Sequence, residues 1–284
     1  MDRRWTTRPQ LVSYELSEAS ANITLNRPRV GKALSAAMVD MLDAAIERGL
    51  REGARIIVFR GAGKHMCTGF DLADIESSTD GDLLLRFVRI EQLLQKIYRC
   101  PLVTVAIGSG RVYGAGADLF TSCDRRISLP GTSFAFPGSG FGLILGARRL
   151  ATRIGNDTAR RILIAGRVIP ASEAARLGLV TDLSEEADLA SRVARLATKA
   201  VRLPARTVAA LHSVTTSRDD DADLAALVNS ASYPGLKDRI TAYRQAIVQQ
   251  RARSTDTPVV DLVELPRLSA AAAFVDTGKC RPGH

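Results

Sequence analysis

Residues 56–75 read IIVFRGAGKHMCTGFDLADI, and this stretch decides the fold. The run RIIVF at 55–59 is short and apolar, which is typical of a strand buried on both faces. Gly61-Ala62-Gly63 then turns the chain, and a loop from Cys67 to Leu72 follows. The stretch therefore predicts a buried strand that ends in a turn and a loop.

The same order recurs further along the chain. Residues 82–99 carry apolar side chains at helical spacing, Pro101 breaks that helix, and LVTVAI at 102–107 predicts a second buried strand. A glycine-rich turn from Gly108 to Gly116 leads into another helix, and the runs RRISL and SFAF supply further strands. This spacing predicts an α/β fold of stacked ββα units.

The residues before this stretch predict a hairpin and a helix. Two strand-like runs, QLVSYEL and SANITLN, lie within residues 10–26, and Asn26-Arg27-Pro28 ends the second because proline cannot continue a strand ladder. Ser35 is a good N-cap for the helix that follows, and Gly53 ends that helix.

From about residue 144 the pattern becomes mostly helical. Asn156 and Ser172 are expected to cap two short helices there. Further helical patterns cover residues 186–200, 205–215, 222–231 and 236–252.

These patterns divide the chain into three parts. We expect residues 1–200 to form the ββα core and residues 201–252 a C-terminal helical region. Residues 253–284 hold Ser, Thr, Pro and an Ala run without a sustained period, so we expect a flexible tail.

The formal net charge of +9 raises the question of an acidic partner. The basic residues are spread through helices beside acidic ones, as in Glu47, Arg48, Arg51 and Glu52. This pattern is typical of a solvated helix surface, so we expect no nucleic-acid partner.

Cysteine spacing and hydropathy exclude several further classes. The cysteines form no CxxC pair, so we expect no metal site: Cys67, Cys100, Cys123 and Cys280. The N-terminus has no apolar signal core, and no run of about 20 apolar residues occurs. We therefore expect a cytoplasmic protein without a membrane partner.

Two loops carry the candidate chemistry. Cys67 to Leu72 follows a strand and turn, and Tyr113 to Asp118 lies between a strand and a helix. Glycine-rich turns before a helix present free backbone N–H groups and a partial positive charge. Either loop alone could bind a phosphate or could simply let a helix pack closely on a sheet.

Five segments in order resemble the enoyl-CoA hydratase/isomerase (crotonase) family over about residues 10–250. They are ITLNRP at 23–28, KALS at 32–35, the stretch at 56–75, GAGADLFTSCD at 114–124 and RVIPASEAARLGLVTDL at 167–183. The resemblance implies a crotonase-like (ClpP/crotonase) spiral of stacked ββα units. It further implies that the helical region 201–252 serves trimerisation, with trimers or hexamers as the assembly.

The resemblance also implies the ligand and two catalytic groups. The substrate would be an acyl-coenzyme A thioester, with coenzyme A as part of the substrate and no permanently bound cofactor. The backbone N–H groups of Phe70 and Ala115 would form an oxyanion hole for the thioester oxygen. Two preorganised amides stabilise the charge of an enolate more than they stabilise the ground state. Ala115 suits this role if its backbone lies in an ordinary region, because alanine disfavours positive φ.

Residues on the coenzyme A side follow from the same resemblance. They are expected to bind the cofactor portion or line the thioester: Lys32, Ala33, Leu34, Thr68, Phe70, Leu72, Tyr113 and Gly114. Two alternatives stay open here. Lys32 could contact a phosphate or be an exposed lysine, and Tyr113 could line the acyl pocket or be a packing residue.

The sequence departs from the family pattern at the catalytic carboxylates. Family hydratases use two glutamates, and here Asp118 stands at the first position and Gly138 at the second. Asp118 could be a single catalytic base, or it could only cap its own helix. Gly138 is expected to leave a hole that an anion or a water could fill.

Because one carboxylate is shortened and the other is absent, three functions stay open. We expect hydration or double-bond isomerisation of an enoyl-CoA in fatty acid metabolism. The alternatives are an acyl-CoA hydrolase or lyase of the same family, or a family member that binds coenzyme A esters without turnover.

Overall fold

Six strands form the main sheet of the computed structural model, which describes residues 10–27, 31–216 and 219–253. They are β1 (Val12–Ser17), β2 (Ser20–Leu25), β3 (Ile56–Gly61), β4 (Val103–Gly108), β6 (Arg125–Ser128) and β9 (Asp182–Leu183). Their order across the sheet is β1-β2-β3-β4-β6-β9. β1 and β2 pair antiparallel as the predicted hairpin, and the other neighbours pair parallel.

Three short strands form a second sheet. They are β5 (Arg111–Tyr113), β7 (Ser133–Ala135) and β8 (Ile169–Pro170), in the order β5-β7-β8. The prediction that residues 108–116 form one turn is wrong, because that segment contains strand β5. This strand pairs with β7, and its Val112 also forms a bridge with Cys67. The chain passes from the main sheet to the second sheet and on into a helix, which is the predicted ββα order.

The helices carry most of the remaining chain. They are α1 (Ala36–Arg51), α2 (Asp80–Tyr98), α3 (Ala115–Ser122), α4 (Ala147–Ile154), α5 (Asn156–Ala165), α6 (Ala171–Arg176), α7 (Leu189–Arg202), α8 (Ala205–Thr215), α9 (Asp220–Ala231) and α10 (Leu236–Arg253). The predicted tail at 253–284 lies outside the described residues, apart from Arg253 at the end of α10.

One of the three predicted helix caps is correct. The Ser35 hydroxyl accepts a hydrogen bond from the Met38 N–H at 3.3 Å, so Ser35 caps α1. Asn156 is instead the first helical residue of α5, because Gly155 links α4 to α5 and stands at the N-cap. Ser172 lies inside α6, which begins at Ala171, where the backbone N–H bonds the Thr132 carbonyl.

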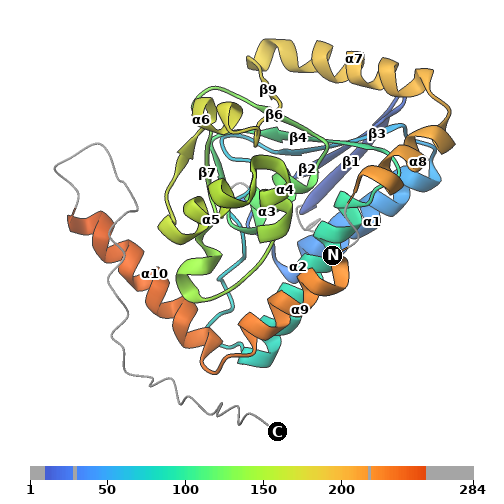
Figure 1. Ribbon diagram of the computed structural model, residues 1–284. Helices are drawn as coiled ribbons and strands as arrows, with labels where there is room; N and C mark the ends of the chain where they lie inside the picture. The colour runs from blue at the N-terminus through green and yellow to red at the C-terminus, as the bar shows by residue number, and fades with distance from the viewer. Residues whose placement is uncertain (1–9, 28–30, 217–218, 254–284) are drawn as a thin grey trace, which may run out of the picture.

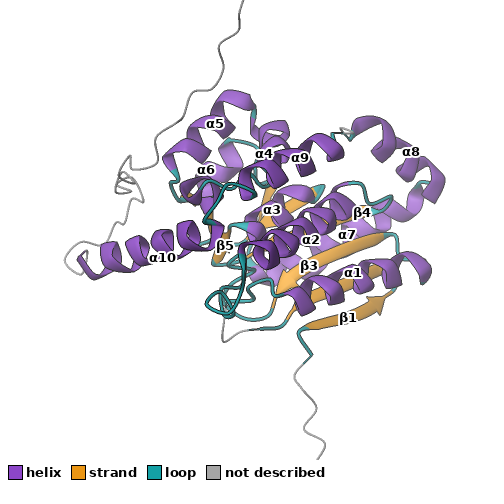
Figure 2. Cartoon of the chain, turned by 90° about the horizontal axis from the view of Figure 1, so that it is seen from below, coloured by secondary structure: helices purple, strands orange, loops and turns teal. Residues whose placement is uncertain are grey.

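Alternating side chains of the parallel strands build two cores. Ile57 and Phe59 of β3 point to the face covered by α1, α2 and α3, while Ile56 and Val58 point to the face covered by α7. Figures 1 and 2 show the helices on opposite faces of the main sheet.

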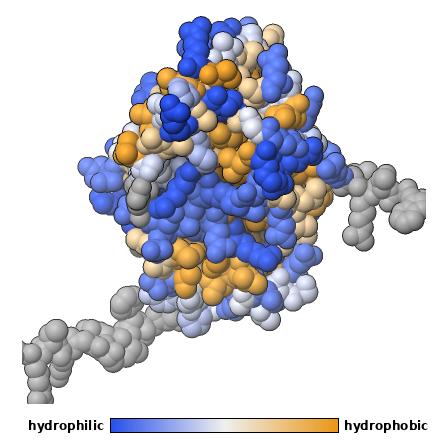
Figure 3. Space-filling view, turned by 90° about the vertical axis from the view of Figure 1, so that its right-hand side faces the viewer, coloured by the Kyte–Doolittle hydropathy of each residue, from blue (hydrophilic) through white to orange (hydrophobic). Residues whose placement is uncertain are grey.

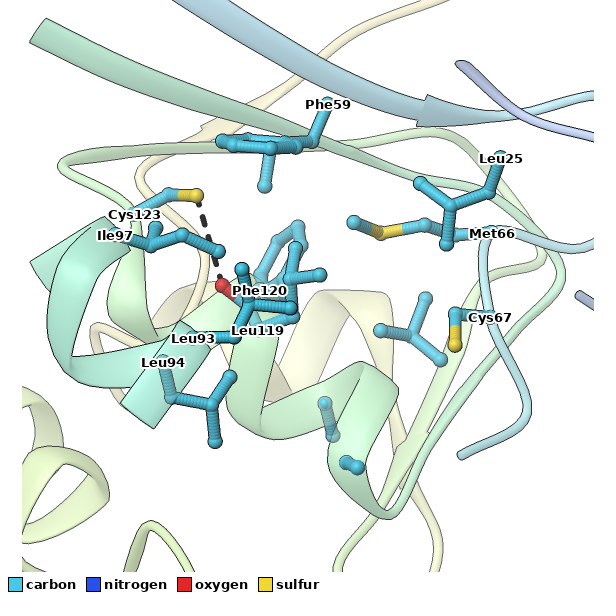
Figure 4. Close-up of a cluster of buried hydrophobic side chains, with 14 of the residues drawn as sticks. Leu25, Phe59, Met66, Cys67, Leu93, Leu94, Ile97, Leu119, Phe120 and Cys123 are labelled. Carbon is cyan, nitrogen blue, oxygen red and sulfur yellow. Dashed lines mark hydrogen bonds between the residues drawn. The ribbon is translucent and has the colours of Figure 1, made fainter. Parts of the chain in front are cut away.

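The larger core lies between the sheet and the α1–α3 face (Figure 4). Phe59 from β3, Phe120 from α3 and Met66 from the loop after β3 meet there, and each is fully buried. The Cys123 thiol donates a hydrogen bond to the Leu119 carbonyl at 3.5 Å, the dashed line in Figure 4. This core fixes α3 and therefore the end of the loop that leads into it.

The basic residues of α1 and α2 lie beside acidic ones, as the sequence predicts. Lys96 contacts the carboxylates of Asp43 and Glu47, and Arg48 contacts Glu52. Hydrophilic residues occupy the middle of the face seen in Figure 3, which views the molecule from the side where α1 and α8 lie in Figure 1.

One ion pair is different because it is buried. Arg149 of α4 donates two hydrogen bonds to Glu91 of α2, at 2.8 and 2.5 Å, and the two side chains are 2% and 1% exposed. Asp223 of α9 lies 3.5 Å from the same guanidinium. The pair therefore holds α2 and α4 together in the interior.

Replacing Glu91 by alanine is expected to lower the free energy of unfolding by about 3–5 kcal/mol, because it leaves a buried guanidinium without its main partner. Glu47→Ala is the matched control, since it removes a surface glutamate from an exposed pair and should change stability little. Urea unfolding of both variants checks this, and equal losses for the two would contradict it.

Candidate active site

Main-chain hydrogen bonds join three segments that are distant in the sequence. The Leu34 N–H donates to the Gly69 carbonyl at 2.7 Å, and the Asp71 N–H donates to the Leu34 carbonyl at 3.2 Å. The Tyr113 N–H donates to the Cys67 carbonyl at 3.0 Å. Residues 31–35, 67–72 and 113–118, which hold all the predicted site residues, are therefore brought together.

Side chains reinforce the first of these junctions. The Thr68 N–H and hydroxyl both donate to the Gly31 carbonyl, at 3.0 and 3.2 Å. Arg27 pairs with the buried Asp71 at 2.6 Å and also donates to the Ala33 carbonyl at 2.8 Å. The sequence pattern does not identify Arg27 and Asp71 as partners, because they are far apart along the chain. They meet only when the segments that carry them pair in the folded protein.

The two glycine-rich loops approach each other closely. Gly69 has φ +99°, and a Cβ placed on it would stand 2.9 Å from the Tyr113 carbonyl oxygen and 3.4 Å from the Ala115 nitrogen. A Cβ on Gly116 would stand 2.5 Å from the Cys67 carbonyl oxygen. Only residues without a side chain allow this contact, so the glycines bring the start of α3 onto the loop at 67–72.

The predicted oxyanion donors have the backbone state that the role needs. Ala115 is the first residue of α3, and its φ is not positive, so the condition on its backbone is met. Within the described part of the chain, the N–H groups of Phe70 and Ala115 donate no hydrogen bond. Free donors at the N-terminus of a helix attract negative charge.

The side chain of Lys32 is buried, not exposed to solvent. The residue has φ +56° and is 2% exposed, so the interpretation of Lys32 as a solvent-exposed lysine is wrong. Burial lowers the pKa of its amine. Its neighbours Ala33 and Leu34 are buried as well.

Cys67 lies under Lys32 and is a packing residue. Its thiol is fully buried and donates a hydrogen bond to the Lys32 carbonyl at 3.2 Å. Burial raises the pKa of this thiol to about 12, which leaves little thiolate for nucleophilic chemistry.

The side chains of Phe70 and Leu72 point into an apolar cluster formed with α2, α9 and α10. The Phe70 ring stacks on Phe87 with ring centroids 4.3 Å apart, and the Arg86 guanidinium lies 4.1 Å from the Phe70 centroid. The Phe70 ring thus packs against α2, while the backbone N–H of the same residue stays unpaired within the described chain.

Tyr113 is half-buried, and its hydroxyl has a partner within the second sheet. The oxygen lies 3.1 Å from the Ser133 hydroxyl, on the neighbouring strand β7. This contact supports the packing interpretation of the side chain. The carbonyl of the same residue faces Gly69.

Asp118 lies in α3 with its carboxylate buried, and the residue is 5% exposed. The interpretation that it only caps α3 is wrong. Gly114 stands at the N-cap, and no side chain bonds the free N–H groups of that helix. The carboxylate instead lies directly against Gly146, whose φ of +65° and lack of a Cβ leave room for it at the start of α4.

The surroundings of Asp118 favour its neutral form. Burial raises the pKa of the Asp118 carboxyl well above its usual range, the nearby Arg149 opposes this rise, and Glu91 adds to it. Arg149 is already paired with Glu91, so it is not a free counter-ion for Asp118. A carboxyl with a raised pKa keeps its proton to a higher pH than an ordinary aspartate does.

The hole expected at Gly138 is not present at the position that a Cβ atom would occupy. A Cβ on Gly138 would stand 3.1 Å from the Leu143 carbonyl oxygen, and the Leu143 N–H donates to the Gly138 carbonyl at 2.9 Å. The chain from 138 to 143 folds back on itself in a 3₁₀ turn, Pro137–Phe141, and fills this space. Of the two positions where carboxylates are expected, only the one at Asp118 therefore carries a carboxylate.

Two further properties concern metals and membranes. Among residues 10–27, 31–216 and 219–253, no group of three or more His, Cys, Asp or Glu side chains could hold a metal ion. The helices within these ranges are too short or too polar to cross a bilayer.

Comparison with known proteins identifies the family. The family model for enoyl-CoA hydratase/isomerase matches residues 15–231. A protein of Rhodobacter capsulatus, named "Probable enoyl-CoA hydratase", is 38% identical over 182 residues, which are 62% of this chain and 70% of that protein.

Solved structures agree with this match. A crystal structure from Bordetella parapertussis, named as an enoyl-CoA hydratase/isomerase, has a TM-score of 0.81 and 42% identity and covers 82% of this chain and 98% of its own. An enoyl-CoA hydratase/isomerase from Xanthobacter autotrophicus Py2 has a TM-score of 0.77 and 25% identity, covering 88% and 99%. The crotonase-like fold is confirmed, and the chain belongs to the enoyl-CoA hydratase/isomerase family.

Proposed function

We propose that this protein binds an acyl-coenzyme A thioester and moves the double bond of an enoyl group through an enolate intermediate. The observation that carries the proposal is the contact between Gly69 and the Tyr113–Ala115 segment, which brings two unpaired main-chain N–H groups, of Phe70 and Ala115, to neighbouring loops. A thioester oxygen that accepts from both would be stabilised as negative charge develops on it.

A single carboxylate suits a proton shift. In such a step the Asp118 carboxylate takes a proton from one carbon of the acyl chain, the thioester oxygen gains the charge, and the same carboxyl returns the proton to another carbon. Water addition in family hydratases uses two carboxylates, and Leu143 fills the space beside Gly138 where the second would start. Isomerisation is therefore favoured over hydration as the main reaction.

Residues 31–34 and 67–72 would bind the coenzyme A portion. Lys32 is buried in this region beside Cys67. An anionic part of the ligand next to its amine would favour the charged form and offset the burial that lowers its pKa. Arg27 holds the region in shape through Asp71 and the Ala33 carbonyl. We further propose a cytoplasmic trimer or hexamer assembled through residues 201–252, with no nucleic-acid or membrane partner.

A specific observation favours a second candidate, a family member that binds coenzyme A esters without turnover. Asp118 is 5% exposed and lies beside the buried Glu91–Arg149 pair, a setting that also suits a purely structural carboxyl. A panel of enoyl-CoA and hydroxyacyl-CoA esters separates the two candidates. Tight binding without turnover of any ester would support the second candidate, and failure to bind any ester would contradict both.

Replacing Ala115 by proline is expected to lower kcat by about 10²–10³-fold, because it removes one oxyanion donor. Proline is tolerated at the first position of a helix, where no intrahelical hydrogen bond is lost. Ala115→Gly keeps the N–H and is the matched control. Steady-state kinetics, with circular dichroism to confirm folding, checks the pair, and near-parent activity in the proline variant would exclude Ala115 as a donor.

Asp118→Asn is expected to lose activity and its pH dependence together. Since burial raises the pKa of Asp118, kcat/KM of the parent should fall as the pH is lowered through that raised pKa, well above the usual range of an aspartate. The asparagine variant should show a low, flat profile over the same range. Equal activity in both proteins would remove Asp118 from the mechanism.

Unfolding of the same two proteins gives a second measurement that is independent of substrate. The raised pKa means that protonated Asp118 stabilises the folded chain at low pH, and that this stability is lost as the pH rises through the folded-state value. The stability of the parent relative to Asp118→Asn should therefore decrease with rising pH. A constant difference would contradict the raised pKa, because it would mean that the carboxyl binds protons equally in the folded and the unfolded chain.

A further inference from the structure

A cavity lies on the opposite face of the main sheet from the candidate active site. Its volume is about 130 Å³, and it lies between α7 and the strands β6 and β9. Its lining is Arg125, Ile127, Asp182, Arg192, Arg195, Leu196 and Lys199. No residue of the three segments that form the candidate active site is among them.

One face of α7 supplies most of this lining. Arg192, Arg195, Leu196 and Lys199 follow the spacing i, i+3, i+4 and i+7, which places them on one side of a helix. Leu196 packs against the smaller core under the sheet. The three basic residues thus share a helix face with Leu196, which packs on this core. A helix usually carries apolar side chains on the face that it turns toward a core.

The charges of the lining do not balance. Four basic side chains and one carboxylate, that of Asp182, line the cavity. Asp182 Oδ2 accepts from Arg125 Nη2 at 2.8 Å and from the Thr181 hydroxyl at 2.7 Å, and Oδ1 lies 3.9 Å from Arg192 Nη1. This one carboxylate cannot neutralise four cations, so the cavity has a net positive charge that would attract an anion.

Two donors in this lining have no acceptor. The Nε atoms of Arg125 and Arg192 are buried and form no hydrogen bond with the described residues. A buried N–H without a partner is unfavourable, and most such groups in folded proteins are paired. A tetrahedral oxyanion presents several acceptor oxygens, which arginine recognises well.

We propose that this cavity is a binding site for a phosphate group, held by Arg125 of β6 and by Arg192, Arg195 and Lys199 of α7. The phosphate would pair the two unpartnered Nε–H groups and offset the excess positive charge. By contacting both β6 and α7, it would also fasten α7 to the sheet. The site would take inorganic phosphate or the phosphate of a small nucleotide, and it is independent of the acyl-coenzyme A site.

Thermal unfolding of the full chain tests this at constant ionic strength, with inorganic phosphate replacing chloride. The midpoint of unfolding is expected to rise and saturate with phosphate, and calorimetry should give one phosphate per chain, because a ligand that binds only the folded state stabilises it. Coenzyme A is left out, because its own phosphates could fill the cavity, and the variants described next separate this site from the acyl-coenzyme A site. A midpoint that does not respond to phosphate beyond the chloride control would overturn the proposal.

Variants locate the site. Arg192→Gln and, separately, Lys199→Gln should each raise the half-saturating phosphate concentration about tenfold or more, since each removes a charged donor. Arg48→Gln is the matched control, because Arg48 is a surface arginine of α1 on the other face of the sheet, paired with Glu52. An unchanged phosphate response in both lining variants would also overturn the proposal.

A parallel titration with a nucleotide identifies the source of the phosphate group. Adenosine monophosphate is titrated in parallel with inorganic phosphate against the parent and the two lining variants. Tighter binding of the nucleotide that is lost in Arg192→Gln indicates a nucleotide as the ligand. Equal binding of the two, with the same loss, indicates that the phosphate group alone is recognised.

Discussion

The candidate active site depends on the backbone contact between the loop at 67–72 and its two neighbours. Leu34 and Gly69 join the first pair of segments, and Cys67 and Tyr113 join the second. These bonds join loop segments that follow or precede different strands, and only Tyr113 itself lies in a strand, β5. They therefore exist only when the units are stacked. The main-chain donors that the proposed chemistry needs are thus positioned by backbone hydrogen bonds rather than by flexible side chains.

Beneath this contact, a small number of buried charges sets the chemistry of the one carboxylate. Arg149 and Glu91 neutralise each other across α2 and α4, and the Asp118 carboxylate lies near them without an ion pair of its own in the described chain. Burial then decides the proton affinity of Asp118. Gly146 permits this arrangement, because any side chain there would displace the carboxylate.

The main sheet separates two environments. On the α1–α3 face, the apolar core and the glycine loops surround the proposed site, made of amide groups and one carboxyl. On the α7 face, a smaller apolar core borders a cavity lined by cations. Because strand residues alternate between the faces, the chain can tune each environment without changing the other.

Sequence by itself determined the hairpin, the helix that begins after Ser35, the two buried strands with their glycine loops and the helical second half, but not the short strands β5, β8 and β9. Local pattern encodes these features, since apolar periodicity, proline and glycine act over a few residues. It also showed where Asp118 and Gly138 depart from the family. Only the tertiary structure decided that Lys32 is buried, that Asp118 lies against Gly146 instead of capping α3, and that Leu143 fills the space at Gly138. Each of these outcomes depends on residues that are far apart in the sequence or on a chain reversal, and burial and contact of that kind are set by packing.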